Sequence, residues 1–323
     1  MTSAIPSTTL HDLYARMLLT RIVDDYAWKL NEQGRAGFLA RSRGYEAAQV
    51  GSAACIEVGT DFTLPYYRDL GVVLTIGMTP YEVFRTYLQT HQANSTDNDT
   101  PSPCEKRQPT LHWGYHKHNT ITGPAPVATQ ILHAAGIAFA SKLRKASIVT
   151  VAYCGDGATS EPDFLEGIRF AALHQLPTVF ICEQDCSQGA SPTICSTPSC
   201  LEELPLPEGL THQRIDGSDI VVVYTAMQAA MRHAREGNGP VLLEMVVIRP
   251  SGLETPSVSE EETGRLSAHE STQSIDQKDP LLRCQQTLRE QGAWDDQWAS
   301  KLSQRLSAEV ERAMQDALRD TAQ

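Results

Sequence analysis

The sequence predicts an α/β protein built on a doubly wound, mostly parallel sheet, with helical extensions at both ends. Apolar runs bounded by turn signals alternate with helical periods between residues 148 and 248, a pattern typical of strands and helices in βαβ units. A segment of small residues at 127–143 predicts a helix that packs closely against such a sheet. Amphipathic segments over 8–33 and 279–322 lie outside this alternation and predict the helical extensions.

Three helices are predicted before the sheet begins. Apolar residues recur at helical spacing over 8–33, and a second helix is predicted over about 44–56. A third covers 79–90, where Thr79 is the expected N-cap. The polar segment 91–110 has three prolines and no apolar period, so it predicts a loop.

The stretch from 148 to 185 predicts a strand, a turn, a helix and a second strand. The β-branched run Ile148 to Tyr153 is typical of a buried parallel strand, and the sequence Gly155-Asp156-Gly157 lies where that strand must turn. A helix is predicted from about Glu161 to Leu173, and the run Thr178 to Cys182 returns as a strand. The polar residues Glu183-Gln184-Asp185 end this second strand.

The remaining elements continue the alternation and then leave it. A strand is predicted near Arg214, a helix over 219–236 and a strand over 240–248. The last helix of the chain carries its apolar face on Leu302, Leu306, Val310, Met314 and Ala317. The sequence therefore predicts an α/β domain with an N-terminal helical arm, a loop or linker, and a C-terminal helical tail, over residues 1–250, 251–278 and 279–323, respectively.

Composition disfavours several classes of protein. The 323 residues carry a net charge of −12, which argues against a nucleic-acid-binding protein because such proteins need basic patches. No apolar run reaches the roughly 18 residues of a membrane span, and the N-terminus lacks the pattern of a signal peptide, so a cytoplasmic location is expected. The eight cysteines form no C-x-x-C pair, and we expect scattered reduced thiols rather than a metal site.

Two aspartates follow the two central strands. Asp156 lies in the turn after the first strand, and Asp185 ends the second, 29 positions later. Because neighbouring parallel strands end at the same ligand-binding edge of a sheet, the two side chains can face one crevice. Carboxylate oxygens suit a hard cation such as magnesium, and Gly155 and Gly157 allow a phosphate to approach the backbone. The residues therefore favour a magnesium–diphosphate site over an ordinary crossover with an aspartate in its turn.

This segment resembles the fingerprint of thiamin-diphosphate-dependent enzymes, in which GDG is followed by a polar pair, usually Asn-Asn. Over about residues 9–318 the chain resembles one family, the alpha subunit of the thiamin-diphosphate-dependent decarboxylating component of 2-oxoacid dehydrogenase complexes. The RQ…HW and ATQ patterns are closer to the branched-chain (2-oxoisovalerate) type than to the pyruvate type. The stretches that carry the resemblance are GFLARSRGYEAAQVG (37–51), LPYYRDLGVVLTIGMTP (64–80), RQPTLHW (107–113), GPAPVATQILHAAGIAFA (123–140) and DPLLRCQQTLREQGAWD (279–295).

The resemblance implies a thiamin-diphosphate-binding fold, the cofactors thiamin diphosphate and magnesium, and roles for individual residues. Magnesium would be bound by the carboxylates of Asp156 and Asp185 and the backbone carbonyl of Ser187. His112 would be the active-site histidine, which can donate a proton, although a structural role is the alternative. The implied substrate-binding residues are Phe38, for which a core position is the alternative, His112 and Trp113. The implied cofactor-binding residues are Tyr66, Tyr67, Arg68, Ala125, Pro126, Val127, Gly155, Asp156, Gly157, Ala158, Thr159 and Asp185.

The chain departs from the family pattern at three places. Asp185 replaces an Asn, which keeps an oxygen ligand but lowers the affinity for diphosphate unless another cation compensates for the added charge. Ala125 replaces a Ser whose hydroxyl group supports a potassium-type site, so that site is not expected. Leu253 and Glu254 stand where the family has a His and a regulated Ser, so control by phosphorylation is not expected.

The resemblance implies oxidative decarboxylation of a branched-chain 2-oxoacid, with transfer of the acyl group to a lipoyl group, as in branched-chain amino acid catabolism. It also implies a beta subunit in a heterotetramer of two alpha and two beta chains, and a lipoyl acyltransferase core. The pyruvate or acetoin type is one alternative. A degenerate, non-catalytic partner subunit is another, motivated by Ala125, Asp185 and Leu253. An unrelated nucleotide-binding enzyme is disfavoured because the chain has no GxGxxG or Walker string.

Overall fold

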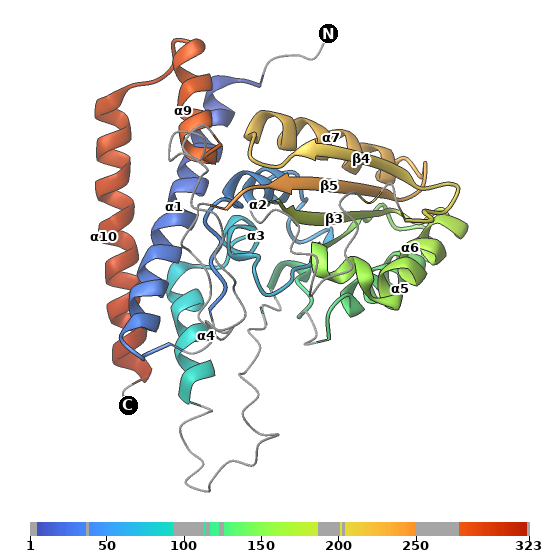
Figure 1. The fold of residues 1–323 in the computed structure, drawn as a ribbon, viewed down its shortest axis with the longest axis horizontal. Helices are drawn as coiled ribbons and strands as arrows, with labels where there is room; N and C mark the ends of the chain where they lie inside the picture. The colour runs from blue at the N-terminus through green and yellow to red at the C-terminus, as the bar shows by residue number, and fades with distance from the viewer. Residues whose placement is uncertain are drawn as a thin grey trace, which may run out of the picture.

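A parallel sheet forms the centre of the computed structural model, which describes residues 5–36, 39–92, 113, 117–122, 126–186, 201, 204–249 and 278–321. Its five strands are β1 (Phe62–Leu64), β2 (Thr150–Gly155), β3 (Thr178–Asp185), β4 (Thr211–Asp216) and β5 (Val241–Val247). They lie in the order β1-β2-β3-β5-β4, and every neighbouring pair is parallel (Figure 1). The predicted fold class is confirmed.

Helices cover both faces of this sheet and add a further layer beside it (Figure 1). Helices α2, α3 and α7 pack on one face, and α5 and α6 pack on the other. The long helices α1 and α10 lie together with α4 and α9 beside the sheet. The helix bounds are α1 (Ser7–Glu32), α2 (Glu46–Ala53), α3 (Leu70–Thr75), α4 (Pro80–Gln92), α5 (Thr129–Leu143), α6 (Pro162–Leu173), α7 (Ile220–Arg235), α9 (Pro280–Glu290) and α10 (Asp296–Thr321).

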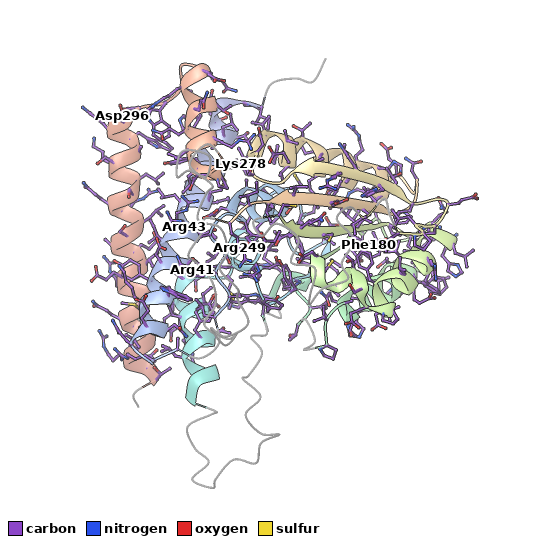
Figure 2. All side chains as sticks on the ribbon, in the orientation of Figure 1. Arg41, Arg43, Phe180, Arg249, Lys278 and Asp296 are labelled. Carbon is purple, nitrogen blue, oxygen red and sulfur yellow. The ribbon has the colours of Figure 1, made fainter. Side chains whose placement is uncertain are left out.

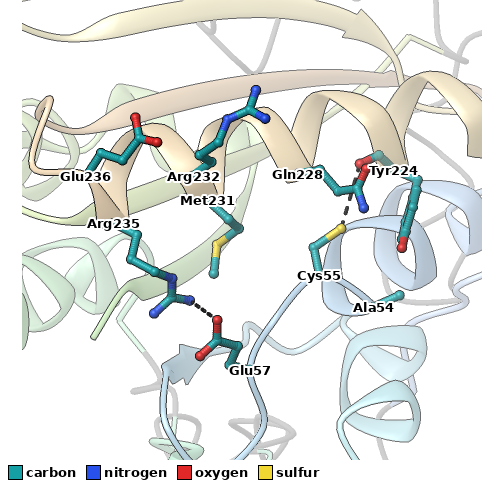
Figure 3. Close-up of a pocket in the computed structure, with 9 residues that line it drawn as sticks. All are labelled: Ala54, Cys55, Glu57, Tyr224, Gln228, Met231, Arg232, Arg235 and Glu236. Carbon is teal, nitrogen blue, oxygen red and sulfur yellow. Dashed lines mark hydrogen bonds and ion pairs between the residues drawn. The ribbon is translucent and has the colours of Figure 1, made fainter. Parts of the chain in front are cut away.

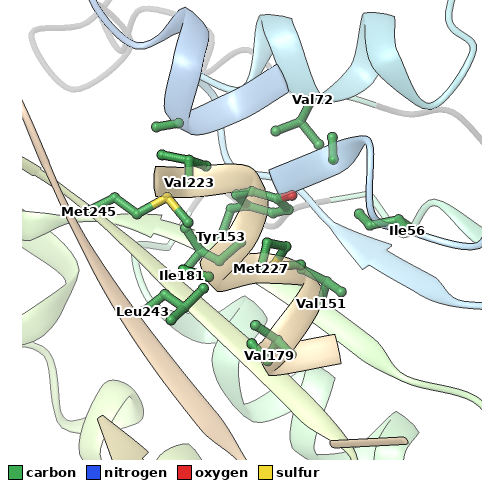
Figure 4. Close-up of a cluster of buried hydrophobic side chains, with 14 of the residues drawn as sticks. Ile56, Val72, Val151, Tyr153, Val179, Ile181, Val223, Met227, Leu243 and Met245 are labelled. Atoms are coloured by element: carbon green, nitrogen blue, oxygen red, sulfur yellow. The ribbon is translucent and has the colours of Figure 1, made fainter. Parts of the chain in front are cut away.

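The core between the sheet and α7 fixes the first of these faces. Tyr153, Ile181 and Leu243 project from the three central strands toward Val223 and Met227 of α7 (Figure 4). All five side chains are fully buried, and burial of each large apolar side chain contributes about 1.5–3 kcal/mol. Because side chains alternate along a strand, residues next to these three on the same strands face the opposite side of the sheet and pack on α5 and α6.

The predicted helical extensions are confirmed in α1, α9 and α10. On α10 the residues Leu302, Leu306, Val310 and Ala317 are buried, and Met314 is partly buried against the same cluster. The predicted cap of α4 is also confirmed, because Thr79 Oγ1 accepts a hydrogen bond from Glu82 N at 3.3 Å. The Glu82 carboxylate in turn accepts one from Thr79 N at 2.8 Å, which completes a capping box.

Some element bounds differ from the predicted ones. Strand β2 begins two residues later than predicted and includes Gly155, so Asp156 is the first residue beyond the sheet and starts a short 3-10 helix, η2 (Asp156–Ser160). Strand β3 ends at Asp185, as predicted, and the Glu183 side chain near its end accepts a hydrogen bond from Tyr66. Strand β1 and helix α3 were not predicted, since 3 and 6 residues are too few to show a period.

The segments predicted as loops are mostly outside the described residues. Helix α4 extends to Gln92, and the rest of the predicted loop 91–110 is not described. The predicted linker 251–278 is described only at Lys278. Within the described ranges, no helix combines the length and the apolar composition that a membrane span requires.

Candidate active site

The two predicted aspartates meet at the carboxyl edge of the sheet. Gly155 at the end of β2 is in register with Glu183 of β3. Asp156, directly after β2, and Asp185, the last residue of β3, therefore lie at the same edge of neighbouring strands. Burial raises the pKa of Asp156, and the nearby negative charge of Asp185 raises it further. The Gly157 N–H donates a hydrogen bond to Asp156 Oδ1 at 3.0 Å. The two carboxylates therefore share one electrostatic environment, as the strand pattern predicted.

Two guanidinium groups lie beside these carboxylates. Arg249 forms an ion pair with Asp185, in which both Nε and Nη2 contact Oδ2. The Arg68 guanidinium lies over the rings of Tyr45 and Tyr67, with centroid distances of 5.3 and 5.6 Å. Both arginines lower the pKa of Asp156, although burial and Asp185 outweigh them. The edge of the sheet thus holds two acidic and two basic side chains.

Tyr66 supports the turn from below. Its Oη donates a hydrogen bond to Glu183 Oε2 at 2.7 Å, and the side chain is buried. Its ring lies 3.4 Å from the position that a Cβ atom on Gly155 would occupy. The structure therefore places Tyr66 under the Gly155-Asp156-Gly157 turn, whereas its neighbour Tyr67 is only half-buried and lies beside Arg68.

A buried hydrogen-bond network fixes the backbone of Arg68. Gln49 Nε2 donates to the Arg68 carbonyl at 3.1 Å and to Glu183 Oε2 at 3.3 Å. Gln49 Oε1 accepts from Gly71 N at 2.9 Å, and Ser42 Oγ donates to the same Arg68 carbonyl at 2.8 Å. Neither Gln49 nor Glu183 was predicted as a site residue. For Glu183 the sequence offered one signal, a charged residue at the polar end of an otherwise apolar strand.

Glu183 lies beside a second buried acid, Asp69. Burial raises the pKa of Glu183 to about 7, and burial together with the Glu183 charge raises the pKa of Asp69 well above its ordinary value. Within the described part of the chain, Glu183 Oε1 and Asp69 Oδ1 have no hydrogen-bond partner. Two neighbouring buried carboxyl groups do not both ionise readily at neutral pH, so this pair holds a proton close to the turn.

Other predicted site residues take supporting positions. Thr159 Oγ1 donates to the Asp156 carbonyl at 2.7 Å, which holds the 3-10 turn, and Ala158 is buried beneath it. Pro126 and Val127 precede α5, and the Val127 side chain is 48% exposed. Beyond these, Gln130 Nε2 donates to the Tyr153 carbonyl of β2 at 2.9 Å. The α5 N-terminus is therefore tied to the strand that ends at Gly155.

The structure places Trp113 in the hydrophobic cluster of the helical layer, against which Tyr67 also packs. The Trp113 ring is buried in the helical layer and packs against Tyr87, with ring centroids 5.7 Å apart. The role predicted for it, substrate binding, stays a prediction. Four further predicted site residues lie outside the described ranges, namely Phe38, His112, Ala125 and Ser187.

The residues at the edge fit a magnesium–diphosphate group. Among the residues that the structure describes, no atom lies within 4 Å of the position that a Cβ atom on Gly157 would occupy. Two carboxylates offer the hard oxygen ligands that magnesium prefers, and planar guanidinium groups match phosphate oxygens. Buried polar side chains beneath the turn hold Arg68 in place.

An open cavity of about 630 Å³ lies elsewhere, between α2 and α7 (Figure 3). Cys55 and Glu57 line one side, and Arg235 from α7 pairs with Glu57 at 3.2 Å and with Asp61 at 2.8 Å. Because Asp61 precedes β1 and Arg235 precedes β5, this cavity is at the amino edge of the sheet. Ligands of open α/β sheets bind at the opposite edge, so we do not assign the active site to it.

Comparisons with known proteins identify the family of the chain. The family model described as the dehydrogenase E1 component matches residues 14–323. The 2-oxoisovalerate dehydrogenase subunit alpha of Bacillus subtilis is 33% identical over 309 residues, which covers 95% of this chain and 89% of that protein. The 3-methyl-2-oxobutanoate dehydrogenase subunit alpha of Mycobacterium tuberculosis is 32% identical over 319 residues, with 98% and 80% covered. The pyruvate dehydrogenase E1 component subunit alpha of Staphylococcus aureus is 30% identical over 309 residues, with 95% and 78% covered. The chain therefore belongs to the dehydrogenase E1 component family, as the sequence resemblance predicted.

Proposed function

We propose that this chain is the alpha subunit of a 2-oxoacid dehydrogenase, that it holds thiamin diphosphate through magnesium, and that its substrate is a branched-chain 2-oxoacid. The observation that carries the proposal is the set of two acidic and two basic side chains at one sheet edge, Asp156 and Asp185 with Arg68 and Arg249. The acidic pair suits the cation, Arg68 suits the phosphates, and Arg249 pairs with Asp185. Membership of the family supports the cofactor class.

Individual residues have distinct parts in this proposal. Asp156 and Asp185 would bind magnesium together with the backbone carbonyl of Ser187, and Arg68 and Tyr67 would bind the diphosphate. When bound, thiamin diphosphate supplies the carbanion stabilisation that decarboxylation of a 2-oxoacid requires. Hydrogen bonds to the Arg68 carbonyl fix its backbone, and the bond from Arg68 Nη1 to the Arg41 carbonyl holds its guanidinium group, so less ordering is needed when the cofactor binds.

The substrate class and the assembly are parts of the same proposal. Two of the relatives described above are named for 2-oxoisovalerate or 3-methyl-2-oxobutanoate and one for pyruvate, and the RQ…HW and ATQ patterns favour the branched-chain type. An alpha subunit implies a beta subunit, and we propose two copies of each. A lipoyl acyltransferase core would accept the acyl group.

One observation favours a second candidate function, a non-catalytic partner subunit. The carboxylate of Asp185, which stands in place of the family's Asn, is already paired with Arg249. If that ion pair blocked the metal, the chain would assemble with a beta subunit but would not bind the cofactor. The departures at Ala125 and Leu253 point the same way.

Calorimetric titration separates the two candidates. The full chain, co-expressed with its beta subunit, is titrated with thiamin diphosphate in the presence and absence of magnesium, and carbon dioxide release is then measured from 3-methyl-2-oxobutanoate and from pyruvate. We expect magnesium-dependent binding and preferential release from the branched substrate. Preferential release from pyruvate would overturn the substrate class, and stable assembly without cofactor binding would establish the partner role.

The variant Asp156→Ala tests the metal assignment directly. We expect it to abolish cofactor binding while the thermal unfolding temperature is retained, because the carboxylate contacts mainly its own turn. Glu166→Ala is the matched control, since Glu166 is an exposed carboxylate on α6 that pairs with Arg169 at 2.8 Å. Unchanged affinity in Asp156→Ala would contradict the assignment.

A further inference from the structure

The ion pair between Asp185 and Arg249 is formed at the position where this chain departs from its family. An Asn at 185 would offer the metal a neutral oxygen, whereas Asp adds a negative charge next to Asp156 and next to any bound diphosphate. The Asp185 side chain is 11% exposed and that of Arg249 is 18% exposed, so solvent screens this charge only partly. The added charge needs a cation within the protein.

We infer that Arg249 is a positioning residue whose guanidinium group compensates for Asp185, so that a site with two aspartates still binds magnesium and diphosphate. The inference rests on the proposed function and goes beyond it, because it assigns a role to a side chain that would touch neither the substrate nor the reacting atoms. It also explains why the Asp at 185 is compatible with cofactor binding.

The fold places Arg249 where this role requires it. Asp185 of β3 is in register with Val247 of β5, and the ladder continues with a hydrogen bond from Cys186 N to the Val247 carbonyl at 2.9 Å. Because side chains two positions apart on an extended chain share a face, Arg249 lies on the same side of the sheet as Asp185. Its guanidinium group then reaches the carboxylate from two residues beyond the register partner.

The turn before α2 fixes the backbone beside Arg249. Gly44 has a φ of +96°, and a Cβ atom there would lie 2.7 Å from the Ile248 carbonyl oxygen and 3.2 Å from Arg249 Cα. Only glycine tolerates this combination of conformation and close approach. Figure 2 labels Arg249 between the long helices and the sheet. The contact with Gly44 holds the end of β5 against the site.

The other nearby arginines have different partners. Arg68 Nη1 donates to the Arg41 carbonyl at 2.8 Å, and its guanidinium group lies against two tyrosine rings. Arg41 pairs with Asp24 at 2.7 Å, and Arg43 lies 3.9 Å from Asp25. Of the four arginines, Arg249 is therefore the one whose ion pair is made with Asp185.

A double-mutant cycle tests the inference. The affinity for thiamin diphosphate at saturating magnesium is measured by calorimetry for the full chain with its beta subunit, as wild type, Arg249→Gln, Asp185→Asn and the double variant. We expect Arg249→Gln to weaken binding by at least about tenfold, the scale of an outer-shell contact at a metal site. In the Asp185→Asn background, Arg249→Gln should change the affinity by less than about threefold, because the Asn removes the charge that needs compensation.

Two further variants guard against trivial outcomes. Arg249→Lys keeps the charge and should bind within about threefold of wild type, which a purely geometric role would not predict. Arg169→Gln removes an exposed arginine on α6 and should change nothing. Thermal unfolding without ligand, recorded for each variant, identifies any loss of affinity that comes from misfolding. If Arg249→Gln misfolds, the affinity of Arg249→Lys relative to wild type tests the inference, and a loss of more than about threefold would contradict it.

The outcomes distinguish the inference from the proposed function. If wild type binds the cofactor and the single effects multiply in the double variant, Arg249 does not compensate for Asp185 and the inference is wrong. If wild type does not bind the cofactor, the proposed function fails and the inference fails with it. Restored binding in the double variant supports both.

Discussion

Buried carboxylates are treated differently in the helical layer and at the carboxyl edge of the sheet. In the helical layer, Asp24 accepts hydrogen bonds from Arg41 Nε at 2.7 Å and from a backbone N–H at 2.9 Å. Glu46, at the start of α2, faces the helical layer and likewise accepts from Arg21 Nε of α1 at 2.8 Å and from a backbone N–H at 2.8 Å. Each of these four carboxylate oxygens has its own donor, so the groups are satisfied entirely within the fold.

At the sheet edge, some buried carboxylate oxygens lack such donors among the described residues. Glu183 Oε1 and Asp69 Oδ1 are buried and have no hydrogen-bond partner among the residues that the structure describes. Asp156 and Asp185 lie together, and the guanidinium groups near them also suit phosphate. Charge that the fold does not fully satisfy is available to bind a ligand.

This difference separates structural from functional carboxylates by an observable rule. A group whose oxygens are all paired inside the chain should affect stability when it is replaced. A group at the edge should affect ligand affinity and leave stability nearly unchanged.

The largest expected effect is on stability, from Glu46→Ala in the helical layer. The change leaves the guanidinium group of Arg21 without one of its two carboxylate partners, the other being Asp279 at 2.7 Å. Removing one partner of a buried pair costs about 3–5 kcal/mol. Urea unfolding measures the loss, and Glu46→Gln, which keeps an oxygen acceptor, should lose less. A loss below about 1 kcal/mol in Glu46→Ala would contradict the structural role.

The second effect is on affinity, from Asp156→Asn at the edge. The amide keeps an oxygen but removes the charge that attracts magnesium, so we expect binding of thiamin diphosphate with magnesium to weaken at least about 100-fold, or nearly 3 kcal/mol. The free energy of unfolding should change by less than about 1 kcal/mol. If this variant lost as much stability as Glu46→Ala, the contrast between the two regions would not hold.

The third effect is a pH dependence from the helical layer. Burial raises the pKa of Asp24 from 3.8 to about 6, despite the opposing charge of Arg41. The folded state therefore binds a proton that the unfolded state has released between about pH 4 and 6. This contribution is complete below about pH 4 and is lost as the pH rises through 6, by an amount on the order of 3 kcal/mol. Unfolding of wild type and Asp24→Asn over this pH range isolates it, and identical pH profiles would refute the assignment.

Much of the edge could be predicted from the sequence, because a parallel sheet brings successive strand ends together. The strand pattern around Asp156 and Asp185 was sufficient to predict their proximity, and it needed no side-chain detail. The capping box at Thr79 and the apolar face of α10 were predictable for the same reason, since both depend on residues a few positions apart.

The partners of these residues could not be predicted in this way. Arg249 is 64 positions from Asp185, and only the β3–β5 register brings them together. Gln49 and Glu183 are 134 positions apart, and neither belongs to a local pattern. Trp113 shows a further limit of local patterns, because a large aromatic residue beside a predicted site residue is equally suited to a core. The structure buries its side chain, and its role in substrate binding stays a prediction.

The smallest expected effect compares two buried tyrosine hydroxyl groups. Tyr66 Oη donates to the Glu183 carboxylate at 2.7 Å, and Tyr153 Oη lies 3.1 Å from the neutral hydroxyl of Ser52. Hydrogen bonds to charged groups contribute about 1.5–3 kcal/mol and neutral ones about 0.5–1.5 kcal/mol. At pH 8, above the Glu183 pKa of about 7, Tyr66→Phe should therefore destabilise the protein about twice as much as Tyr153→Phe.

This comparison tests which of the two buried acids carries the charge. If Glu183 is ionised at pH 8, the difference between the two variants should shrink at pH 5.5, where Glu183 is protonated and both hydroxyl groups have neutral partners. Urea unfolding at the two pH values measures it. Equal losses at pH 8 would mean that Asp69 is ionised in place of Glu183, because the buried pair shares its proton. The hydrogen bond from Tyr66 would then be made to a neutral carboxyl group. The negative charge of the buried pair would be on Asp69, directly before α3.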